Sequence, residues 1–261
     1  MIDLHAHILP GFDDGAESLE EAVAMARCAC DGGISAVVAT PHVVTGLYTP
    51  AKEAILEGVE HFRNLLSAKG IPLNIFPGAE YRLEPDLPDR LARGELLTLN
   101  DSGCYLLVEL PSVMVPGYTN RVVYELLLQG VVPVIAHPER NTGFIKAPSL
   151  LYELINQGAL SQITAGSLTG FFGSNAGAAA RLFLEHGCAQ FVASDAHSST
   201  GRVPVLAAAM QEVSRFIGQE EADRLVKENP RRVVRGVSVV KDDLKEIATS
   251  RRGFLKRLFS R

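Results

Sequence analysis

Short apolar runs alternate with longer amphipathic stretches along most of the chain. The short runs are rich in Val, Ile, Leu and Ala and have the length of buried β-strands. Seven such strands are predicted, at residues 2–7, 35–40, 73–76, 104–109, 131–137, 160–164 and 189–193. The intervening stretches predict helices at residues 19–31, 50–68, 119–129, 150–157, 176–185 and 204–217. This alternation is typical of βα units built around a parallel sheet.

The first helix has well-marked ends. Ser18 is followed three residues later by Glu21, which is the spacing of a capping box, and Gly32-Gly33 follows the last helical residue. Local chemistry therefore predicts where this helix begins and ends.

Histidines are concentrated where the predicted strands end. Five of the seven lie in short blocks that close a strand, namely Asp3-Leu4-His5-Ala6-His7, Thr40-Pro41-His42, Ala136-His137-Pro138-Glu139-Arg140 and Ser194-Asp195-Ala196-His197. Side chains two residues apart point to the same side of a strand, so His5 lies beside His7 and Asp195 beside His197. In parallel α/β folds the carboxyl ends of the strands are where active sites form.

The number of contributing strands distinguishes two α/β folds. In an open doubly wound sheet the site clusters at one switch point and uses few strands, whereas here most of the seven strands end in a polar residue or a glycine-containing turn. We therefore predict a TIM-like barrel, and the 261-residue length is consistent with a single domain over residues 1–240.

Acidic residues stand at matching positions beside the histidines. Imidazole and carboxylate side chains together supply nine candidate metal ligands: His5, His7, Asp14, His42, Glu80, Glu109, His137, Asp195 and His197. Because one ion takes roughly four to six ligands including water, this set predicts two or three divalent ions. The positive ions would also offset the repulsion among four carboxylates. A His and carboxylate set without thiolate suits manganese, iron or zinc.

Two arginines lie close to ligand blocks in the sequence. Arg140 follows His137 by three residues and Arg202 follows Asp195 by seven. A guanidinium beside a metal cluster can hold an oxyanion such as phosphate, and with a metal-activated hydroxide this predicts phosphoester hydrolysis. The alternative is that both arginines form structural ion pairs.

Composition narrows the class of protein. The net charge is −5 and the pI is about 5.8, which argues against a general nucleic-acid binder. No apolar run approaches the roughly 18 residues of a membrane span, and no signal peptide is recognised. The four cysteines are too few and too irregularly spaced for a disulfide framework. We therefore expect a cytoplasmic protein. No cysteine has an arginine six residues later, which excludes a Cys-dependent tyrosine phosphatase loop.

The ordered motifs resemble those of a known superfamily. Asp3-Leu4-His5-Ala6-His7, Asp13-Asp14-Gly15, Thr-Pro-His, Gly-Ala-Glu, His-Pro-Glu-Arg-Asn and Ser-Asp-Ala-His are similar to the motifs of the polymerase and histidinol phosphatase (PHP) superfamily, over residues 1–235. More narrowly, they resemble those of manganese-dependent bacterial protein-tyrosine phosphatases of capsule and exopolysaccharide clusters. The resemblance implies a distorted seven-stranded (β/α)7 barrel, and a phosphotyrosine-containing substrate such as a membrane-associated bacterial tyrosine kinase.

The same resemblance implies how the ligands divide among three ions. One ion would be held by His5, His7, Glu80 and Asp195, a second by Glu80, Glu109 and His137, and a third by Asp14, His42 and His197. It also favours Asp14 over Asp13 as the ligand. Asp13 is as readily interpreted as a turn residue, because Asp-Asp-Gly is ordinary turn chemistry. Arg140 and Arg202 would bind the non-bridging phosphate oxygens.

Two other functions fit the same residues. A small-molecule phosphatase, for example one acting on histidinol phosphate, would use the same metal cluster. Only the residues around the entrance of the site would differ. A docking module would bind metal at the same cluster but would not catalyse a reaction. The full ligand set argues against this second alternative.

The C-terminal residues 241–261 form a separate basic segment. Residues 251–261 carry five basic and no acidic side chains, so residues 1–250 sum to −10. Phe254, Leu255, Leu258 and Phe259 would share one face of a helix. This pattern predicts either weak contact with an anionic membrane or a solubilising tail.

Overall fold

The computed structural model describes residues 1–241 and 243–247, so the tail segment 251–261 lies outside the described residues. The seven predicted strands are confirmed, and two short strands that were not predicted follow two of them after a bend. The strand predicted at 35–40 is β2 (Ala36–Ala39), and β3 (His42–Val43) follows it after Pro41. The strand predicted at 73–76 is β4 (Asn74–Pro77), and β5 (Glu80–Arg82) follows it after Gly78-Ala79. The others are β1 (Ile2–Ala6), β6 (Tyr105–Glu109), β7 (Val132–Ala136), β8 (Leu160–Thr164) and β9 (Phe191–Ala193).

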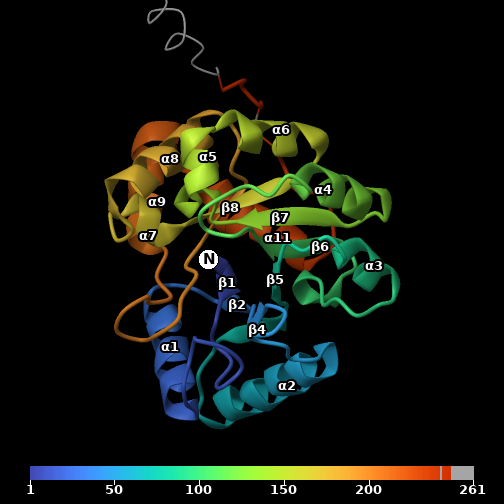
Figure 1. Ribbon diagram of the computed structural model, residues 1–261. Helices are drawn as coiled ribbons and strands as arrows, with labels where there is room; N and C mark the ends of the chain where they lie inside the picture. Colours follow the sequence, from blue (N-terminus) through green and yellow to red (C-terminus); the bar gives the residue numbers. More distant parts are fainter. Residues whose placement is uncertain (242, 248–261) are drawn as a thin grey trace, which may run out of the picture.

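The strands follow one another in a ring of parallel neighbours (Figure 1). One sheet has the order β1-β2-β4 and the other the order β3-β5-β6-β7-β8-β9, with every pair parallel. The segment after β9 returns to β1, where Asp195 N donates to His5 O at 2.9 Å and His7 N donates to Ala196 O at 2.8 Å. The carboxyl ends of the first and last strands are therefore joined, as a distorted barrel requires.

Helices lie around the outside of the strands (Figure 1). The six predicted helices are present as α1 (Leu19–Asp31), α2 (Lys52–Ala68), α4 (Thr119–Leu128), α6 (Ser149–Gln157), α8 (Gly173–Glu185) and α9 (Ala207–Ile217). Short helices that the pattern did not predict are α3 (Leu87–Ala92), α5 (Thr142–Lys146), α7 (Ala165–Leu168), α10 (Gln219–Asp223) and α11 (Asn229–Val234), with single turns η1 (Leu99–Asp101), η2 (Pro138–Arg140) and η3 (Arg224–Glu228). Among the described residues, no helix combines the length and apolar character needed to cross a membrane.

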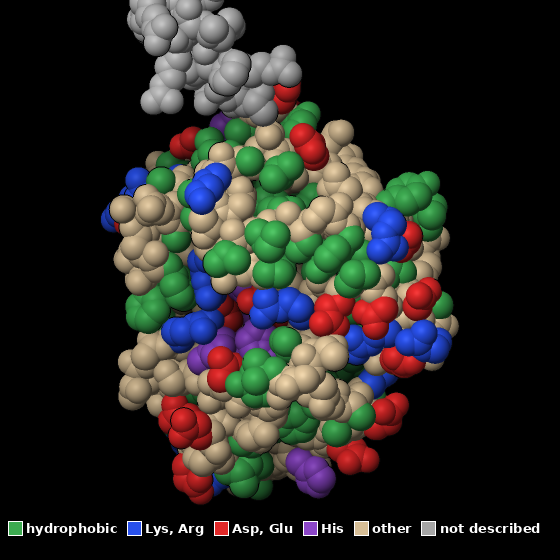
Figure 2. Space-filling model, in the orientation of Figure 1, with side chains coloured by type: hydrophobic (Ala, Val, Ile, Leu, Met, Phe, Trp, Pro, Cys, Tyr) green, Lys and Arg blue, Asp and Glu red, His purple; other side chains and the backbone are tan. Residues whose placement is uncertain are grey.

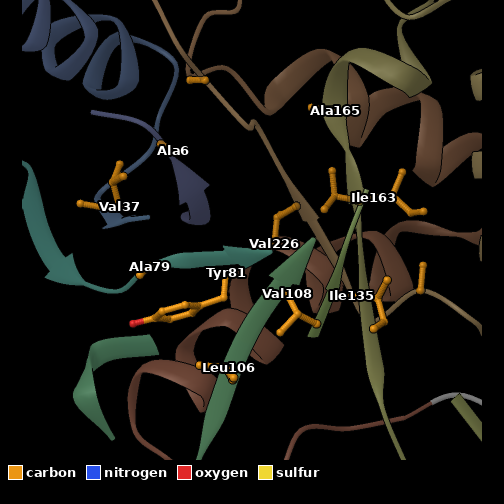
Figure 3. Close-up of a cluster of buried hydrophobic side chains, with 14 of the residues drawn as sticks. Ala6, Val37, Ala79, Tyr81, Leu106, Val108, Ile135, Ile163, Ala165 and Val226 are labelled. Atoms are coloured by element: carbon orange, nitrogen blue, oxygen red, sulfur yellow. The ribbon is translucent and has the colours of Figure 1, made fainter. Parts of the chain in front are cut away.

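Side-chain alternation along the strands builds two apolar layers. Leu106, Val108, Ile135 and Ile163 face outward and pack in the same cluster as buried helix residues (Figure 3). Their neighbours face the interior of the ring, where the second cluster contains Leu4, Val38, Leu107, Val134 and Phe191. Leu99 of η1 and Val233 of α11 belong to this inner cluster. The interior of the ring is therefore filled by a packed apolar core.

The start of α1 departs from the predicted capping box in one respect. Ser18 Oγ accepts the N–H of Glu21 at 3.2 Å, as predicted. The carboxylate of Glu21, however, accepts from Ser199 N at 2.6 Å and from Ser199 Oγ at 3.1 Å. This side chain therefore ties the first helix to the loop that follows β9.

A buried carboxylate fastens β9 to β1. Asp3 is fully buried and accepts from Ser194 N at 2.9 Å and from the Ser194 hydroxyl. It therefore holds the last strand against the first just before the block that contains Asp195.

We predict that Asp3→Ala lowers the free energy of unfolding by roughly 1–3 kcal/mol, because it leaves the buried Ser194 N–H without an acceptor. Asp3→Asn keeps an acceptor and should lose less. Urea unfolding of the two variants measures the difference, and equal stability of Asp3→Ala and wild type would contradict this role.

Candidate metal centre

Seven of the nine candidate ligands lie at the carboxyl ends of strands or in the loops that follow them, and His42 and Glu80 begin β3 and β5 just after the bends that follow β2 and β4. They come from β1 and the loop after it, β3, β5, β6, and the ends of β7 and β9. Figure 2 shows histidine side chains at the centre of one face, with arginine or lysine and acidic side chains around them. The structure thus brings together residues that are up to about 190 positions apart in the sequence.

Four nitrogen and oxygen atoms converge at the base of this site. His5 Nε2 lies 3.1 Å from His7 Nε2. Glu80 Oε2 lies 3.3 and 3.4 Å from these two nitrogens, and Asp195 Oδ1 lies 3.3 and 3.4 Å from them. All four side chains are buried.

Hydrogen bonds on the far side of each ring define what these atoms offer. His5 Nδ1 donates to Gln162 Oε1 at 2.8 Å and His7 Nδ1 donates to Asp13 Oδ2 at 2.6 Å. Burial opposes protonation of His5 and His7, but the neighbouring carboxylates outweigh it and hold the pKa of both rings above the usual range, so without an ion the rings are cationic partners of the carboxylates. A divalent ion would replace the Nε2 protons, and the rings would then keep Nδ1–H and offer two lone pairs beside two carboxylate oxygens in a buried space. Such a set is unfavourable unless a cation lies among them, so these residues fit a divalent ion.

Glu80 links this group to a second one. Its Oε2 also lies 2.9 Å from His42 Nδ1, and its Oε1 lies 3.0 Å from His137 Nε2, which is 4.0 Å from Glu109 Oε1. His42 Nδ1 and Glu80 Oε2 are both buried, and despite the short distance neither makes a hydrogen bond of proper geometry within the described part of the chain. Glu80 therefore contacts both groups, and its carboxylate could serve more than one divalent ion.

A third group lies nearest to solvent. Asp14 Oδ1 is 3.7 Å from His42 Nε2 and 3.6 Å from His197 Nε2, and the Asp14 side chain is 51% exposed. Burial lowers the pKa of His197 to about 3, and His7 and Arg202 act in the same direction. His197 is therefore neutral at ordinary pH and can offer a lone pair.

The two buried carboxylates are ionised despite their burial. Burial acts to raise the pKa of Glu80, but His5, His137 and His42 outweigh it and hold that pKa well below its usual range. Burial likewise opposes ionisation of Asp195, whose pKa is held well below its usual range by His5, His7 and His137. Both groups can therefore supply anionic oxygens.

The backbone is left-handed at two of the ligand positions. His137 has φ 33° and Asp195 has φ 52°, although neither is glycine. Non-glycine residues adopt this conformation at an energetic cost and often at functional sites. Here it turns two side chains into the site at the point where β7 and β9 end.

Both predicted arginines contact the same carboxylate. Arg140 Nη1 and Arg202 Nη2 each donate to Asp195 Oδ2, the oxygen opposite the one that faces the histidines. Both guanidiniums also lie over the ring of Phe172, at 4.2 and 5.7 Å from its centroid. Asp195 thus connects the two arginines to the histidine cluster.

Several residues at the site were not identified from the sequence. Asp13 does accept from Gly15 N at 2.9 Å, as a turn residue would, but it also accepts from His7 Nδ1 and from His42 N. Gln162 had one signal, which is its polar side chain within a buried strand. Phe172 and Arg82, whose Nη2 lies 3.1 Å from Glu109 Oε2, had none. The two remaining histidines lie outside the cluster, His61 on α2 and His186 at the end of α8.

Known proteins share both the sequence and the fold. A family model for capsular polysaccharide synthesis, CpsB/CapC, matches residues 1–235. The tyrosine-protein phosphatase YwqE of Bacillus subtilis (strain 168) is 44% identical over 198 residues, which is 76% of this chain and 78% of that protein. The tyrosine-protein phosphatase CpsB of Streptococcus pneumoniae is 31% identical over 239 residues, which is 90% of this chain and 98% of that protein.

Solved structures agree with this similarity. One from work on YwqE and CpsB, described as unique metal-dependent tyrosine phosphatases, superposes with a TM-score of 0.91 at 38% identity and covers 95% of this chain and 100% of that one. A D-hydantoinase superposes with a TM-score of 0.52 at 14% identity, covering 86% of this chain and 68% of that one, and is similar in fold alone.

We predict that Asp13→Ala lowers metal affinity by roughly 10- to 100-fold, because His7 loses the acceptor that fixes its ring and tautomer. Metal titration monitored by calorimetry measures this change. Glu17→Ala, at an exposed position on the same loop, is the control. Unchanged affinity in Asp13→Ala would mean that the carboxylate only shapes the turn.

Proposed function

The chain belongs to the CpsB/CapC family of capsular polysaccharide synthesis proteins, and we propose that it is a metal-dependent tyrosine-protein phosphatase whose reaction takes place at the nine-residue centre described above. The observation that carries this proposal is the placement of Arg140 and Arg202 against Asp195, whose other oxygen faces His5 and His7. Cationic groups for a phosphate and ligands for divalent ions thus meet on one carboxylate.

We propose that the ligands divide among three ions as the sequence motifs imply. His5, His7, Glu80 and Asp195 would hold the first, Glu80, Glu109 and His137 the second, and Asp14, His42 and His197 the third. The convergence of His5, His7 and Glu80 and that of Asp14, His42 and His197 support the first and third groups. For the second ion, Glu80 and Glu109 also converge with His42, whereas His137 converges with His5 and Asp195. We further propose manganese, because the ligands are imidazoles and carboxylates without thiolate. When bound, such ions lower the pKa of water and neutralise charge on the phosphate.

The chain's own residues orient the substrate. A guanidinium has five N–H donors, so Arg140 and Arg202 can bind the non-bridging phosphate oxygens while each keeps its bond to Asp195. Arg202 Nε has no hydrogen-bond partner among the described residues, so this guanidinium retains donors beyond the one that Asp195 accepts. The leaving phenolate has a parent pKa near 10, so a strong general acid is not required.

The cysteines have no role in this mechanism. Burial raises the pKa of the Cys188 thiol to about 12. Burial and the nearby Asp31 also raise the pKa of Cys28 and Cys30. A thiol that stays protonated is a poor nucleophile.

We propose a phosphotyrosine-containing protein as the substrate, and more narrowly a membrane-associated bacterial tyrosine kinase that controls capsule or exopolysaccharide synthesis. Residues 1–240 would act as one catalytic domain in the cytoplasm. The basic residues 251–261 would bring it to the inner face of the membrane.

We predict that a chelator abolishes hydrolysis of a phosphotyrosyl peptide, that manganese restores it, and that alkylation of the cysteines leaves it intact. Metal content is measured on the same samples. Turnover of histidinol phosphate is measured in parallel, because it is the substrate of the alternative function. Inhibition by a thiol reagent without loss of metal, or faster turnover of histidinol phosphate, would contradict the proposal.

We predict that Arg140→Ala and Arg202→Ala each lower turnover by roughly 10- to 1,000-fold, the range for removal of a preorganised charge from the transition state. Metal content should stay near that of wild type, because neither arginine belongs to the ligand set. Metal loss as large as that in His5→Ala would assign both arginines a structural role.

For the tail we predict that the full-length protein sediments with anionic vesicles at low salt, since each basic residue near such a surface contributes about 1 kcal/mol. A form that ends at Ser250 should remain in the supernatant. Equal sedimentation of the two forms would remove the membrane role and leave the assignment of the site unchanged.

A further inference from the structure

A cavity of about 240 Å³ lies beside the metal centre and takes no part in the mechanism described above. Its walls come from the segment after β8, the segment after β9 and the first turn of α9. Most of the lining side chains are apolar, among them Ala165, Phe171, Phe172, Val203, Val205 and Ala208.

This apolar pocket and the phosphate-binding groups share two walls. Arg202 lines the cavity and also donates to Asp195. Phe172 lines it as well, and its ring lies under the guanidiniums of both Arg140 and Arg202. A phosphate held by the two arginines would therefore lie close to the mouth of the pocket.

One wall of the pocket carries an exposed aromatic side chain. Phe171 is 60% exposed and makes an edge-to-face contact with Phe172 at 5.0 Å between ring centroids. An exposed apolar group beside an apolar cavity is typical of a surface that binds another molecule.

The occupant is argued from the chemistry of the neighbouring groups. The only charged side chain in the lining is Arg202, which already pairs with Asp195, so an acidic side chain would gain little there. In an extended peptide a residue two positions away lies roughly 7 Å along the chain. A side chain near a bound phosphotyrosine can therefore reach a cavity that adjoins Arg202.

We propose that this pocket binds an apolar side chain located within about three residues of the phosphotyrosine in the same polypeptide. The inference rests on the proposed phosphatase function and adds a sequence preference to it. Arginines and metal ions select the phosphate, and the pocket selects the segment that carries it.

The test uses phosphotyrosyl peptides in which leucine replaces serine at one position at a time, from three residues before the phosphotyrosine to three after it. Wild-type protein should show a roughly 5- to 20-fold higher kcat/KM for leucine at one or two positions, in the range expected when an aliphatic side chain is partly buried. Ala208→Phe, an exposed position of α9 that lines the pocket, should abolish this preference.

The matched control is Ala207→Phe, which adds the same ring at the neighbouring exposed position outside the lining and should keep the preference. Both variants should hydrolyse p-nitrophenyl phosphate at the wild-type rate, because neither touches the metal centre. No preference in wild type, or an equal loss for leucine and serine peptides in Ala208→Phe, would overturn the proposal. Failure of wild-type protein to hydrolyse p-nitrophenyl phosphate would instead count against the phosphatase function itself.

Discussion

The central constraint in this molecule is the convergence of imidazole nitrogens and carboxylate oxygens at the carboxyl end of the strands. His5 Nε2, His7 Nε2, Glu80 Oε2 and Asp195 Oδ1 all lie within 3.4 Å of at least two of the others. Buried carboxylates repel one another unless positive charge is supplied. The fold therefore holds together a group of atoms that fits a divalent ion, and the other candidate ligands extend this group toward solvent.

Much of the structure serves to hold that arrangement. Asp3 and Ser194 fasten β9 to β1, Gln162 and Asp13 set the tautomers of His5 and His7, and the left-handed backbone at His137 and Asp195 turns these ligands inward. Asp195 connects two groups, since one oxygen faces His5 and His7 and the other accepts from both arginines. In the proposed mechanism, metal binding and phosphate binding would therefore be connected through one side chain.

The fold and the grouping of the nine candidate residues were largely accessible from the sequence. Apolar runs with polar residues at their ends predicted seven strands, and the period of two between His5 and His7 placed both on one side of β1. The bends at Pro41 and Gly78-Ala79 and the short helices were not predicted, because segments of a few residues show no periodicity. Gln162, Phe172 and Arg82 were missed because their roles depend on tertiary contacts with residues far away in the sequence. The division of ligands among ions was implied by family resemblance and not by the spacing.

Anomalous X-ray scattering from crystals of the manganese-loaded protein, recorded above and below the manganese absorption edge, tests the central claim most directly. The account predicts two or three manganese peaks among the nine residues, one of them between His5, His7, Glu80 and Asp195. A single peak elsewhere, or no peak among these four side chains, would contradict it.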